Sequence, residues 1–167
     1  MDKNQSKVAV IMGSDSDLGV MQSCIDLLEE FGIATCVNII SAHRTPNLAA
    51  EFADNAHING IKVIIAAAGM AAHLAGSIAA RTPLPVIGVP MNANAGIGGI
   101  DALLSTVQMP GGIPVATVSI GKAGAKNAAI LALQILALSD EVMHEKLVEF
   151  RRVQSEKVKE KNAKLGK

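Results

Sequence analysis

The chain has 167 residues, of which 50% are apolar, and its fifteen basic and fifteen acidic side chains give a formal net charge of zero. This balance argues against a protein held on nucleic acid or on a membrane surface by a broad basic field. The sequence has no Trp, no Tyr and only three Phe, which argues against stacking on bases or on a flavin ring. We therefore expect one domain with a sizeable core, no nucleic-acid partner and no membrane partner.

Short β-branched runs alternate with longer helical stretches from the start of the chain. Residues 8–12 are predicted to form a buried strand, and helical spacing follows over residues 16–31 until Gly32. A second strand over residues 34–40 leads into a helix over residues 45–59. These runs are typical of two successive strand–helix units.

The same alternation continues to the C-terminus. The remaining predicted elements are strands over residues 63–68, 85–89 and 115–120 and helices over residues 71–81, 100–107, 123–138 and about 140–163. The strands are continuous apolar runs, which is typical of burial on both faces of a parallel sheet. Repeated strand–helix units place helices on both faces of such a sheet. The pattern predicts an α/β fold, a three-layer αβα sandwich with an extra C-terminal helix.

The charges are concentrated at the C-terminal end. Residues 139–167 hold eight of the basic and six of the acidic side chains, and the first 138 residues hold only seven and nine. A body of that size with so little charge, rich in Ala and Gly, indicates surface that is buried between subunits. We expect a homo-oligomer.

The two cysteines, Cys24 and Cys36, make neither a disulfide framework nor a metal-binding spacing, and we expect two small buried hydrophobic side chains. No His, Cys, Asp or Glu residues share a spacing that would hold a metal. Residues 1–7 lack the apolar core of a signal peptide. The longest uncharged apolar run, residues 63–72, is about half as long as a membrane helix. The sequence predicts a cytoplasmic protein without a metal site.

Ligands of parallel α/β folds bind outside the carboxyl ends of the strands, so three loops hold the candidate site residues. In the first loop, residues 13–17, the turn at Gly13 and the hydroxyls and amides that follow it suit a phosphate at a helix N-terminus. Its carboxylates suit ribose hydroxyls instead. Simple helix capping by Ser16 or Asp17 explains the same residues equally well.

The second loop, residues 41–46, gives the sharper signal. Arg44 can pair with an anion in a bidentate manner, assisted by Ser41 and free backbone amides. His43 is the side chain best suited to moving a proton near neutral pH. Pro46 fits the first position of the helix that follows. The alternative is a surface His beside a solvated Arg, and we favour the functional interpretation.

The third loop, residues 68–76, is built from small residues that let the backbone approach a ligand closely. His73 is its only polar side chain. By residue type alone, a structural His satisfied by backbone groups is the commoner case. His57 and His144 are expected at the surface.

Six segments occur in the order and spacing of a known family. They are residues 8–17 (VAVIMGSDSD), 41–46 (SAHRTP), 71–74 (AAHL), 84–90 (LPVIGVP), 107–113 (VQMPGGI) and 121–127 (GKAGAKN). Over about residues 7–150 the chain resembles the PurE family, class I N5-carboxyaminoimidazole ribonucleotide (N5-CAIR) mutases. The resemblance implies a flavodoxin-like subunit with one catalytic domain over residues 1–167, its core at about 7–138 and its last helix at about 140–163. It also implies a homo-octamer with sites near subunit contacts.

The activity that the resemblance implies moves a carboxylate within one substrate. N5-CAIR becomes 4-carboxy-5-aminoimidazole ribonucleotide (CAIR) in de novo purine biosynthesis, without a metal, nucleotide cofactor or biotin. We expect decarboxylation, retention of the CO2 in a closed pocket and recarboxylation at ring carbon 4. In this hypothesis His43 gives the first proton and takes the second.

The functional positions of the family can be carried over residue by residue. His43 matches the catalytic His, and His73 matches the second family His, which lies near the imidazole. Asp17 is assigned to the ribose hydroxyls and Arg44, with Ser41, to the phosphate. The full set of expected substrate-binding residues is Ser14, Asp17, Arg44, Ser41, Ser16, Ala42, Gly69 and Ala71.

The third loop departs from the family pattern at two positions. Met70 stands where the family has Gly, and Ala75 stands where it has Pro. Residues 91–94 also replace a stretch of small polar residues. Two alternative functions remain: a class II aminoimidazole ribonucleotide (AIR) carboxylase that takes free CO2, and a non-catalytic nucleotide- or flavin-binding module on the same fold.

Overall fold

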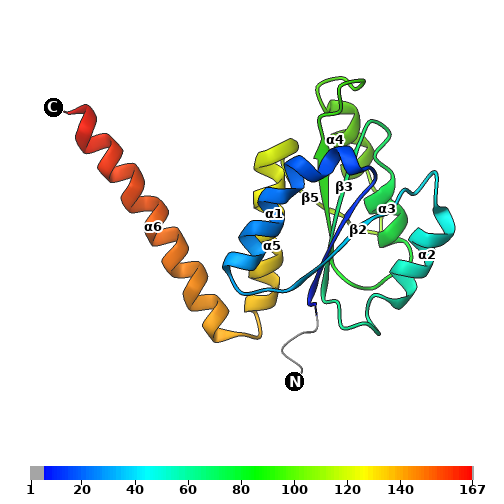
Figure 1. Ribbon diagram of the computed structural model, residues 1–167, viewed down its shortest axis with the longest axis horizontal. Helices are drawn as coiled ribbons and strands as arrows, with labels where there is room; N and C mark the ends of the chain where they lie inside the picture. The colour runs from blue at the N-terminus through cyan, green and yellow to red at the C-terminus, as the bar shows by residue number, and fades with distance from the viewer. Residues whose placement is uncertain (1–5, 167) are drawn as a thin grey trace. The chain divides into compact units, whose positions relative to one another are not determined.

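The computed structural model describes residues 6–166, and the chain divides into two compact units. The first unit ends at Ala132 and the second begins at Leu133. The described part of the first unit contains a five-stranded parallel sheet in the order β2-β1-β3-β4-β5 (Figure 1). Its strands are β1 (Val8–Met12), β2 (Thr35–Ile39), β3 (Val63–Gly69), β4 (Val86–Met91) and β5 (Ala116–Thr117).

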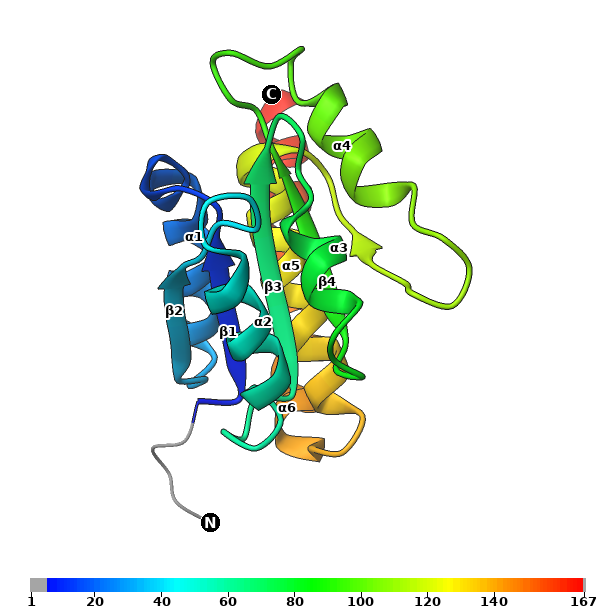
Figure 2. The ribbon, with the colours of Figure 1, turned by 90° about the vertical axis from the view of Figure 1, so that its right-hand side faces the viewer.

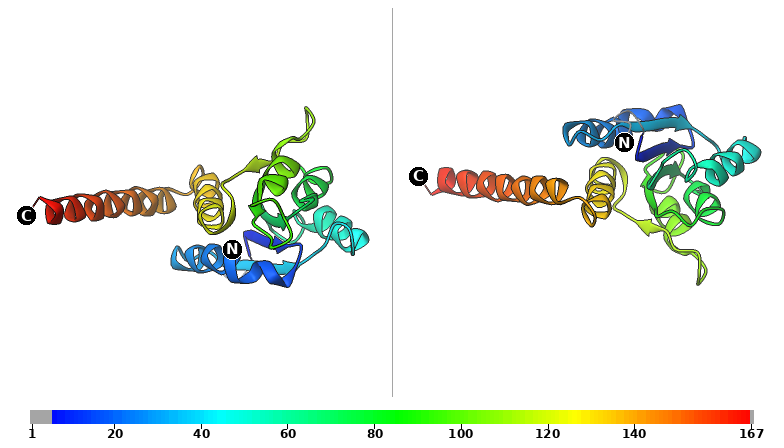
Figure 3. Two further views of the ribbon diagram at one scale, coloured as in Figure 1. Left: turned by 90° about the horizontal axis from the view of Figure 1, so that it is seen from above. Right: turned by 90° about the horizontal axis from the view of Figure 1, so that it is seen from below.

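Helices connect the strands and cover both faces of the sheet. They are the 3-10 helix η1 (Asp15–Asp17) and the α-helices α1 (Leu18–Glu30), α2 (Pro46–Asn55), α3 (Leu74–Ala79), α4 (Ile100–Val107) and α5 (Gly121–Ala137). Figure 2 shows α2 and α3 in front of the sheet and α1 behind it. The end-on views of Figure 3 show the same layers. The strand order is that of flavodoxin-like folds, so the predicted three-layer α/β architecture is confirmed.

The parallel register brings the carboxyl ends of the strands to one edge of the sheet. Met12, the last residue of β1, pairs with Ile39 at the end of β2 and with Ala67 near the end of β3. Gly69, the last residue of β3, pairs with Met91 at the end of β4. The loops that follow these four strands therefore meet at this edge.

The apolar runs of the central strands form the core. All of β1 and β4 is buried, as are residues 63–67 of β3. β2 is different, because it lies at the edge of the sheet and the side chains of Val37 and Ile39 are 41% and 53% exposed. The prediction of burial on both faces is therefore wrong for β2. Cys24 is buried as expected, which raises the pKa of its thiol to about 12, but Cys36 on β2 is only partly buried.

The helix expected over residues 71–81 is shorter in the structure. Met70 has a left-handed backbone conformation with a φ of 56°, which interrupts the regular backbone before this segment. The N–H of His73 then donates to the carbonyl of Ala71 at 2.9 Å, in a turn that a regular α-helix does not contain. The helix α3 begins only after this turn.

Other boundaries also differ from the sequence prediction. The second helix ends at Asn55 instead of near residue 59, and turns continue to Gly60, which has a φ of 85°. The last strand keeps only two residues, which pair with Ile87 and Gly88 of β4 at the other edge of the sheet. The first predicted helix starts as the 3-10 helix η1 before it continues as α1.

The second unit contains the end of α5 and the long helix α6 (Glu141–Leu165). The carboxylate of Asp140 caps α6 by accepting a hydrogen bond from the N–H of Met143 at 3.0 Å. Exposed ion pairs such as Arg152–Glu149 lie along it. The predicted C-terminal helix is confirmed. Within residues 6–166, no helix has the length and apolar character needed to cross a membrane.

Candidate active site

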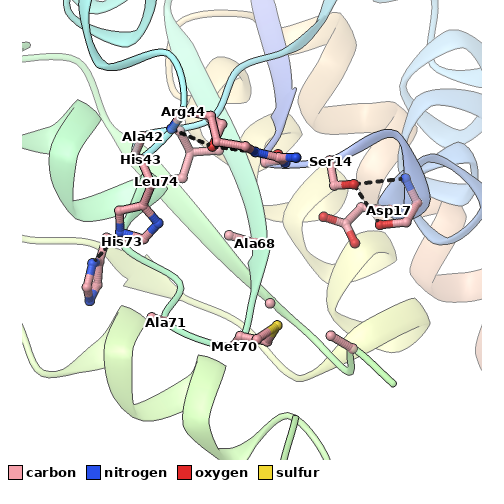
Figure 4. A pocket seen from close by; sticks show the side chains of 15 residues that line it. Ser14, Asp17, Ala42, His43, Arg44, Ala68, Met70, Ala71, His73 and Leu74 are labelled. Carbon is pink, nitrogen blue, oxygen red and sulfur yellow. Dashed lines mark hydrogen bonds between the residues drawn. The ribbon is translucent and has the colours of Figure 1, made fainter. Parts of the chain in front are cut away.

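A cavity of about 430 Å³ lies at the edge of the sheet where the strands end, and side chains from four loops line it (Figure 4). The ten residues that the sequence singled out all lie on its wall: Ser14, Ser16, Asp17, Ser41, Ala42, His43, Arg44, Gly69, Ala71 and His73. The lining also includes Ala93, from the loop after β4, which was not among the three candidate loops. The same rule about strand ends applies to β4 and could have found it.

The first loop is organised by Ser14. Its hydroxyl oxygen accepts hydrogen bonds from the N–H of Ser16 at 3.3 Å and from the hydroxyl of Ser16 at 2.9 Å. Ser14 therefore caps η1, whereas the capping hypothesis had named Ser16 or Asp17. Asp17 stands at the N-cap position of α1, as considered from the sequence, but its carboxyl makes no capping hydrogen bond and lines the cavity half-buried. Burial raises the pKa of Asp17, a hydrogen bond with Ser16 opposes the rise, and the charge of Asp15 adds to it.

The second loop is closed by Thr45. Its hydroxyl donates to the carbonyl of Ser41 at 3.0 Å and accepts from the N–H of the same residue at 3.0 Å. The hydroxyl of Ser41 in turn accepts from the backbone N–H of Arg44 at 3.2 Å and from its Nε at 3.4 Å. The guanidinium also donates from Nη2 to the carbonyl of Gly13 at 2.8 Å. Arg44 is thus fixed between the first two loops, with further N–H groups for an anion.

His43 and His73 meet at one end of the cavity. Nε2 of His43 lies 2.8 Å from Nδ1 of His73, and the two rings are nearly perpendicular, with an interplanar angle of 79°. One ring must supply a proton and the other a lone pair at this contact. Both side chains are exposed. His73 is therefore paired with another imidazole, which differs from the backbone-satisfied structural His considered from the sequence.

The third loop brings backbone close to the cavity. A Cβ atom at Gly69 would lie 3.0 Å from Cβ of Ala93 and 3.4 Å from the carbonyl of Met91, so only Gly fits without a shift. Met70 follows it and is the one residue other than Gly with a positive φ in the described chain. An L-residue in this region costs about 1–2 kcal/mol. The small side chain of Ala71 completes this part of the wall.

The donor set of the cavity consists of hydroxyls, one guanidinium, one carboxyl and two imidazoles. Across residues 6–166, no group of three or more His, Cys, Asp or Glu side chains could hold a metal ion. The arrangement can bind an anion at Arg44, accept hydrogen bonds at Asp17 and exchange protons at His43 and His73.

A family model described as AIR carboxylase matches residues 7–157. The chain belongs to the AIR carboxylase family. This confirms the resemblance to the PurE family that the motifs indicated. The chain is similar to the N5-carboxyaminoimidazole ribonucleotide mutase of Synechocystis, with 54% identity over 95% of this chain and 88% of the relative.

Further relatives also match over nearly their whole length. The N5-carboxyaminoimidazole ribonucleotide mutase of Escherichia coli is 50% identical over 94% of this chain and 92% of its own. That of Pyrococcus horikoshii is 53% identical over 99% and 92%. Among solved structures, the crystal structure of Treponema denticola PurE has a TM-score of 0.85 and 28% identity, covering 96% of this chain and 98% of that one. The likeness of this chain to the family thus extends from motifs to the whole fold.

Proposed function

We propose that this chain is an N5-CAIR mutase, an isomerase that converts N5-CAIR to CAIR in de novo purine biosynthesis. The observation that carries the proposal is the 50–54% identity, over nearly the whole chain, to relatives named for this activity. The cavity adds support, since a ribonucleotide needs an anion site, a hydroxyl site and a proton-exchanging group side by side. The proposal keeps the single catalytic domain and the cytoplasmic location expected from the sequence.

The polar wall of the cavity supplies the binding groups in this proposal. Arg44 holds the phosphate with its guanidinium. Ser41 assists, because its hydroxyl accepts a hydrogen bond from Nε of Arg44 and so fixes the guanidinium. The carboxyl of Asp17 accepts hydrogen bonds from the ribose. Ser14, Ser16 and Ala42 also line the cavity, and the small residues Gly69 and Ala71 leave room for the flat ring.

His43 moves the proton in the proposed reaction. The carboxylate of N5-CAIR is bonded to the exocyclic nitrogen, and a proton given to that nitrogen breaks the C–N bond and leaves AIR and CO2. Ring carbon 4 then attacks the carbon of CO2, a C–C bond forms, and carbon 4 loses its proton to the same imidazole. No net proton is gained or lost. Holding CO2 beside the ring contributes up to about 7–11 kcal/mol in ideal cases.

His73 positions the imidazole of His43 in this scheme. Since Nε2 of His43 is engaged with Nδ1 of His73 at 2.8 Å, we assign the exchange with substrate to Nδ1 of His43. The contact also fixes the orientation of the ring and couples the tautomer of His43 to that of His73. His73 remains near enough to the cavity to contact the ring carboxylate.

A homo-oligomer, with an octamer as its expected form, belongs to the same proposal. Helix α4 and the turn before it support the proposal with an exposed apolar stripe, formed by Ile97 in the turn and by Ile100, Leu104 and Val107 in the helix. A stripe of this kind is typical of a surface that another subunit covers.

A paired assay tests the function. Purified protein receives N5-CAIR in one cuvette and AIR with bicarbonate in the other, and CAIR formation is measured in both. A mutase forms CAIR from N5-CAIR at low enzyme concentration and is slow with AIR and bicarbonate. The reverse preference would instead identify the AIR carboxylase that the name of the family suggests. Nucleotide binding without turnover in either cuvette would leave a non-catalytic module.

A further inference from the structure

The cavity has a polar wall and an apolar wall, and Met70 is the longest side chain of the apolar one. Figure 4 shows Met70 across the cavity from Arg44, with Ala68 between them and Asp17 to one side. The other apolar lining residues are Ala or Gly, apart from Leu74, which is 2% exposed. Met70, which is 49% exposed, is therefore the large apolar side chain that this wall offers to a ligand.

In the free chain, neither the backbone conformation nor the burial of the side chain explains a Met at position 70. Its φ of 56° lies in the region that Gly enters readily and other residues avoid. Its side chain is 49% exposed and so is not part of the core. Gly69, the residue before it, lies so close to Ala93 and Met91 that a Cβ atom there would force a shift, so the chain before Met70 passes close to the end of β4 and the loop that follows it. A strained backbone that presents an exposed apolar side chain to a cavity indicates a contact that forms when the cavity is occupied.

We infer that Met70 packs against the imidazole ring of the bound ribonucleotide and strengthens binding at the ring end of the site. This inference rests on the proposed function. A thioether suits the contact, since it is flexible and its polarizable sulfur interacts favourably with aromatic rings. The ring stays in place while the carboxylate moves, so the contact is the same before and after the reaction. Met70 therefore lowers KM and leaves kcat nearly unchanged.

Methionine oxidation measures the contact in the unmodified protein. Met70 is the one exposed methionine among residues 6–166, and Met109, which is partly buried and outside the cavity, serves as an internal control. Dilute hydrogen peroxide converts accessible thioethers to sulfoxides, which mass spectrometry counts. Saturating AIR should slow oxidation of Met70 several-fold and leave Met109 unchanged. Ribose 5-phosphate, which lacks the ring, should leave both rates unchanged.

Two variants test how much Met70 contributes to the affinity for the substrate. Met70→Gly should raise the dissociation constant of AIR several-fold without changing that of ribose 5-phosphate, and its KM should rise while kcat holds. Met70→Leu, which keeps an apolar side chain of similar volume, should bind AIR nearly as the parent does. The conformation at position 70 accepts Gly, so Met70→Gly should fold; a circular dichroism melt checks this.

Two results overturn the inference while the proposed function stands. One is an active parent protein whose Met70 oxidises equally fast with and without AIR. The other is a Met70→Gly variant with unchanged affinity for AIR. If the parent protein neither binds AIR nor converts N5-CAIR, the proposed function itself fails, and the role of Met70 fails with it.

Discussion

Nε2 of His43 and Nδ1 of His73 lie 2.8 Å apart, although the two residues come from the ends of different strands. At this distance one ring donates its N–H and the other accepts with a lone pair, because two N–H groups facing each other would repel. In the proposed mechanism the pair acts as a unit, and the ring nitrogens that face away from the contact are left to exchange protons with the substrate. Arg44 and Ser41, next to His43, are fixed by their own hydrogen bonds and do not compete for either ring.

Replacing His43 tests the proton transfer. His43→Asn keeps a polar group of similar size but cannot give and take a proton, so kcat should fall by about 10²–10⁴-fold. Binding of AIR, measured by calorimetry, should stay close to that of the parent. His57→Asn is a matched control, because His57 is exposed and outside the cavity. Turnover near the parent value in His43→Asn would remove this residue from its role.

Replacing Arg44 tests the phosphate site. Arg44→Ala removes charge-assisted hydrogen bonds to the phosphate, each worth about 1.5–3 kcal/mol, so KM should rise by about 10–100-fold or more. Loss of the bond to Gly13 should also loosen the first loop. Steady-state kinetics measure the effect, with the exposed Arg151→Ala on α6 as a control. An unchanged KM would contradict the phosphate assignment.

Much of this candidate site could be predicted from the sequence, because the apolar runs show where the buried strands end. Buried apolar runs located β1 and β3, and the rule for parallel sheets placed Asp17 and Arg44 at one edge. The contact between His43 and His73 could not be predicted, since it depends on where α3 begins relative to the end of β2. The left-handed conformation of Met70 could not be predicted either, because a positive φ is normally expected at Gly and not at Met.

Asp17 should make folding stability depend on pH. Burial raises its pKa, so the folded state binds a proton more tightly than the unfolded state does. The resulting stabilisation is complete below the ordinary pKa of an aspartate and is lost as pH rises through the raised value. Asp17→Asn should therefore be more stable than the parent at neutral pH, with the advantage disappearing in acid.

Thermal melts of Asp17→Asn from acid to neutral pH measure this dependence. Asp26→Asn, at an exposed position on α1, is the control and should not gain stability in the same way. Binding of AIR should weaken in Asp17→Asn, because the amide replaces a charged acceptor for the ribose hydroxyls. A melt difference that is the same at every pH would contradict the raised pKa.

Met70→Gly should stabilise the chain even though it weakens binding. It removes the left-handed strain of about 1–2 kcal/mol, and the greater freedom of Gly in the unfolded chain offsets about half of that. A net gain of up to about 1 kcal/mol corresponds to a rise in Tm of about 2–4 °C. Ile58→Gly, at an exposed turn position without a positive φ, should lose stability instead. A lower Tm for Met70→Gly would show that the Met side chain stabilises the folded chain.

The exposed apolar stripe on α4 is expected to form the contact between subunits. Leu104 is 53% exposed at the centre of the stripe, between Ile100 and Val107. A charge there would be costly at a covered interface, so Leu104→Glu should reduce the mass measured by light scattering below that of the parent. The parent should run well above its monomer mass of 17.2 kDa. Leu165→Glu, near the end of α6, is the control and should assemble as the parent does. If the parent is a monomer, or if Leu104→Glu assembles normally, this face of α4 is not the subunit contact.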